Sequence, residues 1–68
     1  MNLQRMIYKI MQNQNISIYT KRKQLQHFLG QLGEYSENTE ELETAYTTIM
    51  VFIEFLRYEE EYQKKGLK

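Results

Sequence analysis

The chain has 68 residues, a mass of 8.3 kDa and a formal net charge of zero, from nine basic and nine acidic residues, and its length predicts one domain, residues 1–68. The absence of Cys excludes disulfide scaffolds and thiolate metal sites, and three Gly with no Pro exclude collagen-like and Pro/Gly-rich chains. No stretch approaches the roughly 18 apolar residues of a membrane span, and the first residues lack a signal-peptide core, so we expect a cytoplasmic protein with no membrane partner.

The first predicted element is an amphipathic helix over residues 2–14. Its apolar residues fall at i, i+3, i+4, i+7 and i+8, the spacing of one helix face: Leu3, Met6, Ile7, Ile10 and Met11. The polar residues 12–15 have weak helix propensity, so the helix is expected to end among them.

A second helix is predicted over residues 17–33. Its apolar stripe consists of Leu25, Phe28, Leu29 and Leu32. Asn15, Ser17 and Thr20 are alternative N-caps. Gly33 suits the left-handed residue that follows a helix, so we expect the helix to end there.

The third predicted helix, residues 39–65, is the longest. Asn38 or Thr39 can cap it, acidic residues crowd its first turn, and Lys64 and Lys65 suit its last turn. Residues 46–55 are rich in β-branched and aromatic side chains, which leaves a strand as the alternative, although no other segment offers a good partner strand. The fold class expected is all-α: a helical hairpin packed on a longer C-terminal helix.

The long helix has two apolar faces. At 100° per residue, one face collects Leu42, Ala45, Tyr46, Ile49, Ile53 and Leu56. The other collects Val51, Phe55, Tyr58 and Tyr62. Three interpretations compete for this second face: a homodimer interface, a contact with another protein, and burial under the two shorter helices. The homodimer is favoured, because a domain this small has a marginal core and association is a common remedy.

Few residues indicate chemistry. The one histidine, His27, has only Gln24 and Gln31 as helical neighbours at i−3 and i+4, and the chain has no Asp to complete a triad. The pairs among Glu37, Glu40 and Glu43 lack a second carboxylate cluster on another helix. We therefore expect no catalytic residue, no metal, no cofactor and no enzymatic activity.

Charge is unevenly distributed along the chain. Residues 1–33 contain five cations and no acid, namely Arg5, Lys9, Lys21, Arg22 and Lys23, whereas residues 34–63 contain all nine acids and only Arg57 as a cation. This asymmetry favours a charged partner. The five N-terminal cations are the candidate contacts for nucleic acid, although a pI of about 6.6 is low for such a domain.

The sequence thus predicts a small non-enzymatic protein–protein interaction module, a regulator, inhibitor or adaptor of a larger protein, acting as a homodimer. The alternative is a nucleic-acid-binding or DNA-associated regulator that uses the basic residues of the first two helices. Abundant Asn, Lys, Ile, Tyr and Phe are typical of an AT-rich genome, such as that of a low-GC bacterium or its phage.

Overall fold

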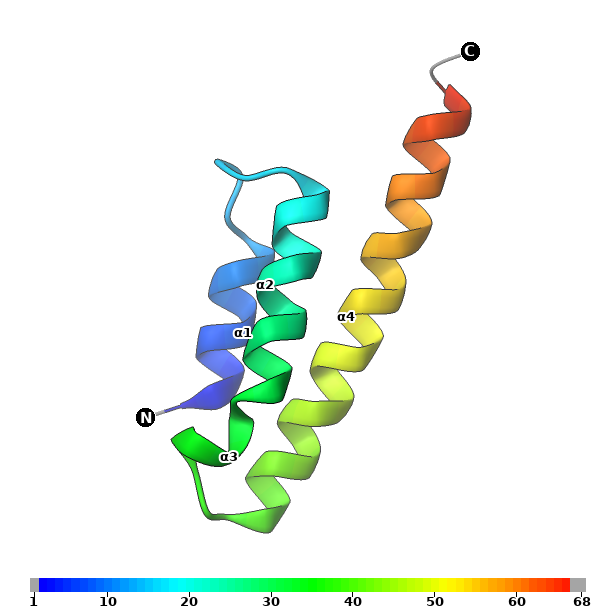
Figure 1. Cartoon of the computed structure of the whole chain (residues 1–68). Coiled ribbons are helices and arrows are strands. Elements are labelled where there is room, and N and C mark those ends of the chain that lie inside the picture. Colours follow the sequence, from blue (N-terminus) through cyan, green and yellow to red (C-terminus); the bar gives the residue numbers. More distant parts are fainter. Residues whose placement is uncertain (1, 67–68) are drawn as a thin grey trace.

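Four helices form the part of the chain described by the computed structural model, residues 2–66 (Figure 1). They are α1 (Leu3–Met11), α2 (Ile18–Gly30), α3 (Leu32–Tyr35) and α4 (Thr39–Gly66). Met1, Leu67 and Lys68, at the ends of the expected domain, lie outside the described residues. The all-α expectation is confirmed for the described part of the chain, and residues 46–55 are helical rather than a strand.

Helices α1 and α2 form an antiparallel hairpin that packs on one side of α4 (Figure 1). Gln4 donates from Nε2 to Thr48 Oγ1 at 3.1 Å, and one turn further along both helices the rings of Tyr8 and Phe52 meet edge to face, 5.5 Å between centroids. These two contacts show that α1 runs parallel to α4. The molecule is elongated, 47 × 20 × 15 Å, because α4 extends beyond the hairpin at its C-terminal end.

The hydrophobic core lies between the hairpin and one face of α4. Its buried members are Leu3, Ile7, Leu25, Phe28, Leu32, Ala45, Ile49, Ile53 and Leu56. The apolar spacing predicts all nine positions, and five further predicted residues are partly buried against them: Met6, Ile10, Met11, Leu29 and Leu42. Tyr46, expected on the buried face, is 53% exposed. The face of α4 that the hairpin covers is centred on Ala45, Ile49 and Leu56. Tyr46 lies at the edge of this face, where a tyrosine can pack its ring and keep its hydroxyl in water.

Helix α1 is shorter than the expected 2–14. Asn2 is its N-cap, with its side chain accepting from the Arg5 N–H, and the last helical residue is Met11. Lys21 donates from Nζ to the Met11 carbonyl at 2.9 Å, and the Asn13 side chain accepts from the Asn15 N–H at 2.9 Å. The Lys21 bond satisfies a carbonyl at the end of α1. The Asn13 bond forms a turn where the helix was expected to continue, because Asn side chains compete for backbone groups.

The expected helix 17–33 is divided at Gln31 into α2 and α3. Ser17 is the N-cap of α2, accepting from the Thr20 N–H at 3.1 Å. Gly33 lies inside α3 and no described glycine has a positive φ, so the expected left-handed helix end at Gly33 is wrong. The division at Gln31, where φ is −109° and ψ is 4°, instead accompanies burial of Leu32 and packing of Tyr35 on Phe28, 5.1 Å between ring centroids.

Helix α4 follows the expected 39–65 closely, ending at Gly66. The Asn38 side chain accepts from the Glu41 N–H at 3.2 Å, which confirms Asn38 as its cap. With 28 residues, α4 measures about 42 Å and is the axis on which the hairpin rests.

Candidate protein-contact surface

The second apolar face of α4 is exposed in the single chain. Val51 is 58% exposed, Phe55 55%, Tyr58 70% and Tyr62 79%; we call these four residues the α4 stripe. The interpretation in which the two shorter helices bury both faces of the long helix is therefore wrong. The physical reason is that α1 and α2 lie side by side on the same side of α4 and leave its far side uncovered (Figure 1).

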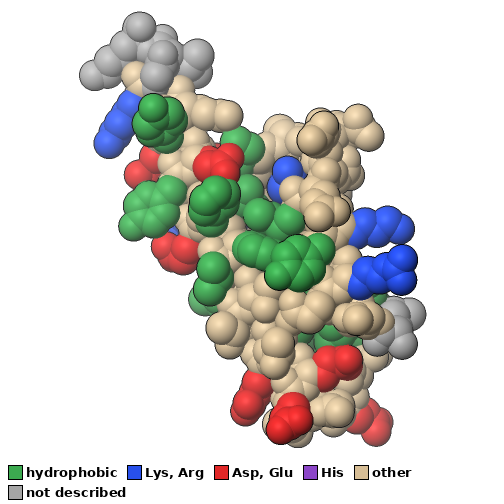
Figure 2. Space-filling view, turned by 180° about the vertical axis from the view of Figure 1, so that it is seen from behind, with side chains coloured by type: hydrophobic (Ala, Val, Ile, Leu, Met, Phe, Trp, Pro, Cys, Tyr) green, Lys and Arg blue, Asp and Glu red, His purple; other side chains and the backbone are tan. Residues whose placement is uncertain are grey.

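The α4 stripe forms a row of exposed apolar side chains along the helix. Figure 2 shows hydrophobic side chains following α4 on this face of the molecule, with acidic side chains among them. A shallow groove is lined by Phe55, Tyr58, Tyr62, Glu59 and Gln63. Contiguous exposed apolar surface with a polar rim is typical of a site where another molecule binds. Tyrosines suit such a site, because the ring packs while the hydroxyl stays in water.

Acidic side chains border the α4 stripe on both edges. Glu54 lies four residues before Tyr58, and Glu61 lies three residues after it. Both line a hollow together with Arg57, whose Nη1 is 3.9 Å from Glu54 Oε1. Glu59 lines the groove on the other edge. Three carboxylates and one guanidinium thus surround the apolar residues, a local excess of negative charge.

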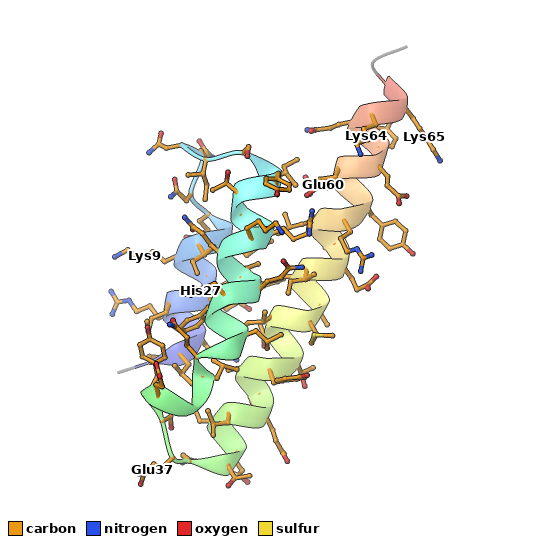
Figure 3. All side chains as sticks on the ribbon, in the orientation of Figure 1. Lys9, His27, Glu37, Glu60, Lys64 and Lys65 are labelled. Carbon is orange, nitrogen blue, oxygen red and sulfur yellow. The ribbon has the colours of Figure 1, made fainter. Side chains whose placement is uncertain are left out.

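The structure does not bring the five N-terminal cations into one patch. Lys21 is engaged with the carbonyl of Met11, and Arg22 points toward α4. Lys9 lies on α1 and points away from the bundle (Figure 3). Arg5, Lys9 and Lys23 are exposed, and Lys23 lies 5.5 Å from the centroid of the Tyr19 ring. Two of the five candidate nucleic-acid contacts therefore donate hydrogen bonds within the chain, and a third, Lys23, contacts an aromatic ring of the same helix.

The partner of Arg22 is Glu60. Arg22 Nε lies 2.8 Å from Glu60 Oε1 and Nη2 lies 3.4 Å from Oε2, so the pair is bidentate, and the two side chains are only 17% and 21% exposed. The hydrogen bond from Arg22 lowers the pKa of the Glu60 carboxyl and raises the pKa of Arg22. The sequence favours Lys64 as the partner of Glu60, by the i,i+4 rule, and gives no local signal for a partner 38 residues away.

The residues considered for chemistry are dispersed. His27 is exposed on α2, and Glu37 lies in the connection between α3 and α4 (Figure 3). Among residues 2–66, no three His or Glu side chains cluster in a way that could hold a metal ion. Within the same residues, no helix is both long enough and apolar enough to cross a membrane.

Comparison with protein-family models, with curated proteins and with solved structures finds no match. We therefore base the functional proposal on the exposed residues of the α4 stripe and the charges beside it.

Proposed function

We propose that this protein is a small non-enzymatic interaction module that regulates, inhibits or adapts a larger protein through the α4 stripe. The observation that supports this is the exposure of four large apolar side chains on a helix whose opposite face is the core. A surface helix is normally polar on its outer face, and a helix that is apolar on both sides is usually covered on both.

The energetics favour a partner on this face. Val51 and Phe55 are each a little more than half exposed, so burying them on a partner would contribute about 1 to 2 kcal/mol each. A domain of this size has only a small core of its own, so such a contact adds appreciably to its stability. The sequence predicts a second copy as the occupant of this face, and this stays a prediction.

The test is affinity capture from nuclease-treated lysate of the source cells, with the wild type compared with Phe55→Glu. We expect at least one protein to be retained by the wild type and lost from the variant, because a carboxylate in the centre of the stripe cannot be buried without a partner. Circular dichroism should show that the variant keeps its helices, since Phe55 is exposed in the single chain.

The matched control is the double variant Arg5→Glu, Lys9→Glu, which reverses two exposed cations on α1 and leaves the stripe intact. Under the proposal it retains the same protein as the wild type. Partners that disappear on nuclease treatment, or that are lost from the α1 variant and kept by Phe55→Glu, would overturn the proposal and favour nucleic-acid binding by the basic residues.

A further inference from the structure

The spacing of the α4 stripe is that of a coiled-coil seam. Val51, Phe55, Tyr58 and Tyr62 are separated by four, three and four residues, which places them at successive d, a, d and a positions of a heptad repeat. All four are more than half exposed, so the seam is open along its length. A narrow a/d seam is the contact that a helix makes with one further helix.

The residues flanking the seam are acidic. In this register Glu54 and Glu61 occupy g positions, and Glu59 occupies an e position. Phe52, the other e residue between Val51 and Glu61, packs against Tyr8 of the same chain. Arg57, at the c position, lies behind the g edge, 3.9 Å from Glu54, so that the seam and its edges carry a net excess of two negative charges between Val51 and Tyr62, and Lys65 follows at the next d position.

This charge pattern disfavours a second copy of α4 on the seam. In a parallel pair, g residues face the e residues of the next heptad, which places Glu54 opposite Glu59 of the other copy. In an antiparallel pair, g residues face g residues, which places Glu54 opposite Glu61. Two-fold symmetry repeats each contact. Like charges at these positions oppose pairing, and flanking charges are the feature that selects coiled-coil partners.

We propose that the α4 stripe binds an amphipathic helix of a different protein, with apolar residues at its own a and d positions and Lys or Arg at its e and g positions. This inference rests on the proposed function, and specifies its partner. A basic helix would bury the seam and place cations opposite Glu54, Glu59 and Glu61, so that hydrophobic burial and charge favour the same complex.

Two synthetic helices test the partner chemistry. Both have Leu and Ile at a and d positions, one has Lys at every e and g position and the other has Glu. Binding to the full chain is measured by fluorescence anisotropy at neutral pH and low salt. We expect the Lys helix to bind at least about tenfold more tightly than the Glu helix, with an affinity that falls as salt is added. Equal binding of both helices, or tighter binding of the Glu helix, would overturn the proposal.

Sedimentation velocity of the wild type supplies the second arm. We expect a monomer at neutral pH. A wild-type dimer that becomes a monomer on Phe55→Glu substitution would show that a second copy covers the stripe, which overturns the basic partner and leaves the interaction module standing. If neither synthetic helix binds, the basic-helix partner is wrong; the capture experiment with Phe55→Glu then decides separately whether the stripe is a contact surface.

A charge reversal at one position provides a sharper test. Glu54→Lys places a cation opposite Glu59 or Glu61 of another copy, so this variant should self-associate more strongly than the wild type and bind the Lys helix more weakly. Glu43→Lys is the matched control, because Glu43 is exposed on the same helix but lies outside the e and g positions beside the stripe. Equal changes in both variants would show that net charge alone, rather than the seam, governs binding.

Discussion

At the residue scale, the ion pair between Arg22 and Glu60 joins α2 to the C-terminal half of α4. Its bidentate geometry is more specific than that of an exposed lysine pair, and both side chains are mostly covered. The pair also withdraws Arg22 from the basic run 21–23 that the sequence offers as a nucleic-acid contact. Arg22, which the sequence presents as a free surface charge, thus has a structural role.

The lowered pKa of Glu60 predicts a specific pH dependence of folding. The ordinary value is 4.5, and the folded value is lower because Arg22 stabilises the carboxylate. The unfolded chain therefore takes up this proton at higher pH than the folded chain. The stabilisation is fully present above the ordinary pKa and is lost as the pH falls through the folded value.

Glu60→Gln should lower the free energy of unfolding near neutral pH, and its difference from the wild type should shrink below about pH 5. Urea unfolding measured between pH 3 and 7 checks this. Glu43→Gln, at an exposed site on the same helix, controls for loss of a carboxylate in general. A difference between wild type and Glu60→Gln that stays constant down to pH 3 contradicts the assigned ion pair.

Gly33 gives a second prediction at this scale. Its φ is negative, it lies within α3, and a Cβ added there meets no atom within 4 Å. Gly33→Ala should therefore stabilise the fold by about 0.5 to 1 kcal/mol, because alanine restricts the unfolded chain at no cost to the folded one. Thermal unfolding measures the effect. A destabilisation of similar size would indicate the left-handed conformation that the sequence alone predicts.

At the element scale, α4 has one face in the core and one face in solvent. Ile49 is fully buried, whereas Val51, two residues later, is 58% exposed. Ile49→Ala should cost about 2 to 5 kcal/mol of unfolding free energy, as expected for a cavity in a packed core. Val51→Ala should change it by less than about 0.5 kcal/mol in the single chain.

Urea unfolding of these two variants, at protein concentrations low enough to keep the chain monomeric, tests the orientation of α4 directly. Similar costs for both substitutions would mean that both faces are buried, and that the hairpin wraps around α4 instead of lying on one side of it.

Local patterns predict the helices and their apolar positions, and long-range packing decides the rest. The Asn38 cap and the core positions of α4 follow from spacing within the segment itself. The break at Gln31 does not follow from local spacing, because it depends on the burial of Leu32 in the core and on the packing of Tyr35 against Phe28. The four stripe residues follow from periodicity, but their exposure depends on where α1 and α2 lie, which no local pattern specifies.

At the scale of the whole molecule, the helical hairpin and α4 form an asymmetric structure. One side of α4 completes the core, and the other carries an apolar seam between acidic edges. The remaining exposed cations of the N-terminal third lie on α1 and α2, away from that seam. The protein therefore presents two chemically distinct surfaces, and the apolar one offers the larger gain on binding because hydrophobic burial is the main driving force of association.

The most direct test of the contact surface is a two-dimensional ¹H–¹⁵N NMR titration of the labelled chain with the synthetic Lys helix. We predict that chemical-shift changes cluster at the α4 stripe and its acidic neighbours. The amide chemical shifts of α1 and of the outer face of α2 should not change. Changes confined to Arg5, Lys9 and Lys23, or scattered without a cluster on α4, would contradict the assignment of the α4 stripe as the binding surface.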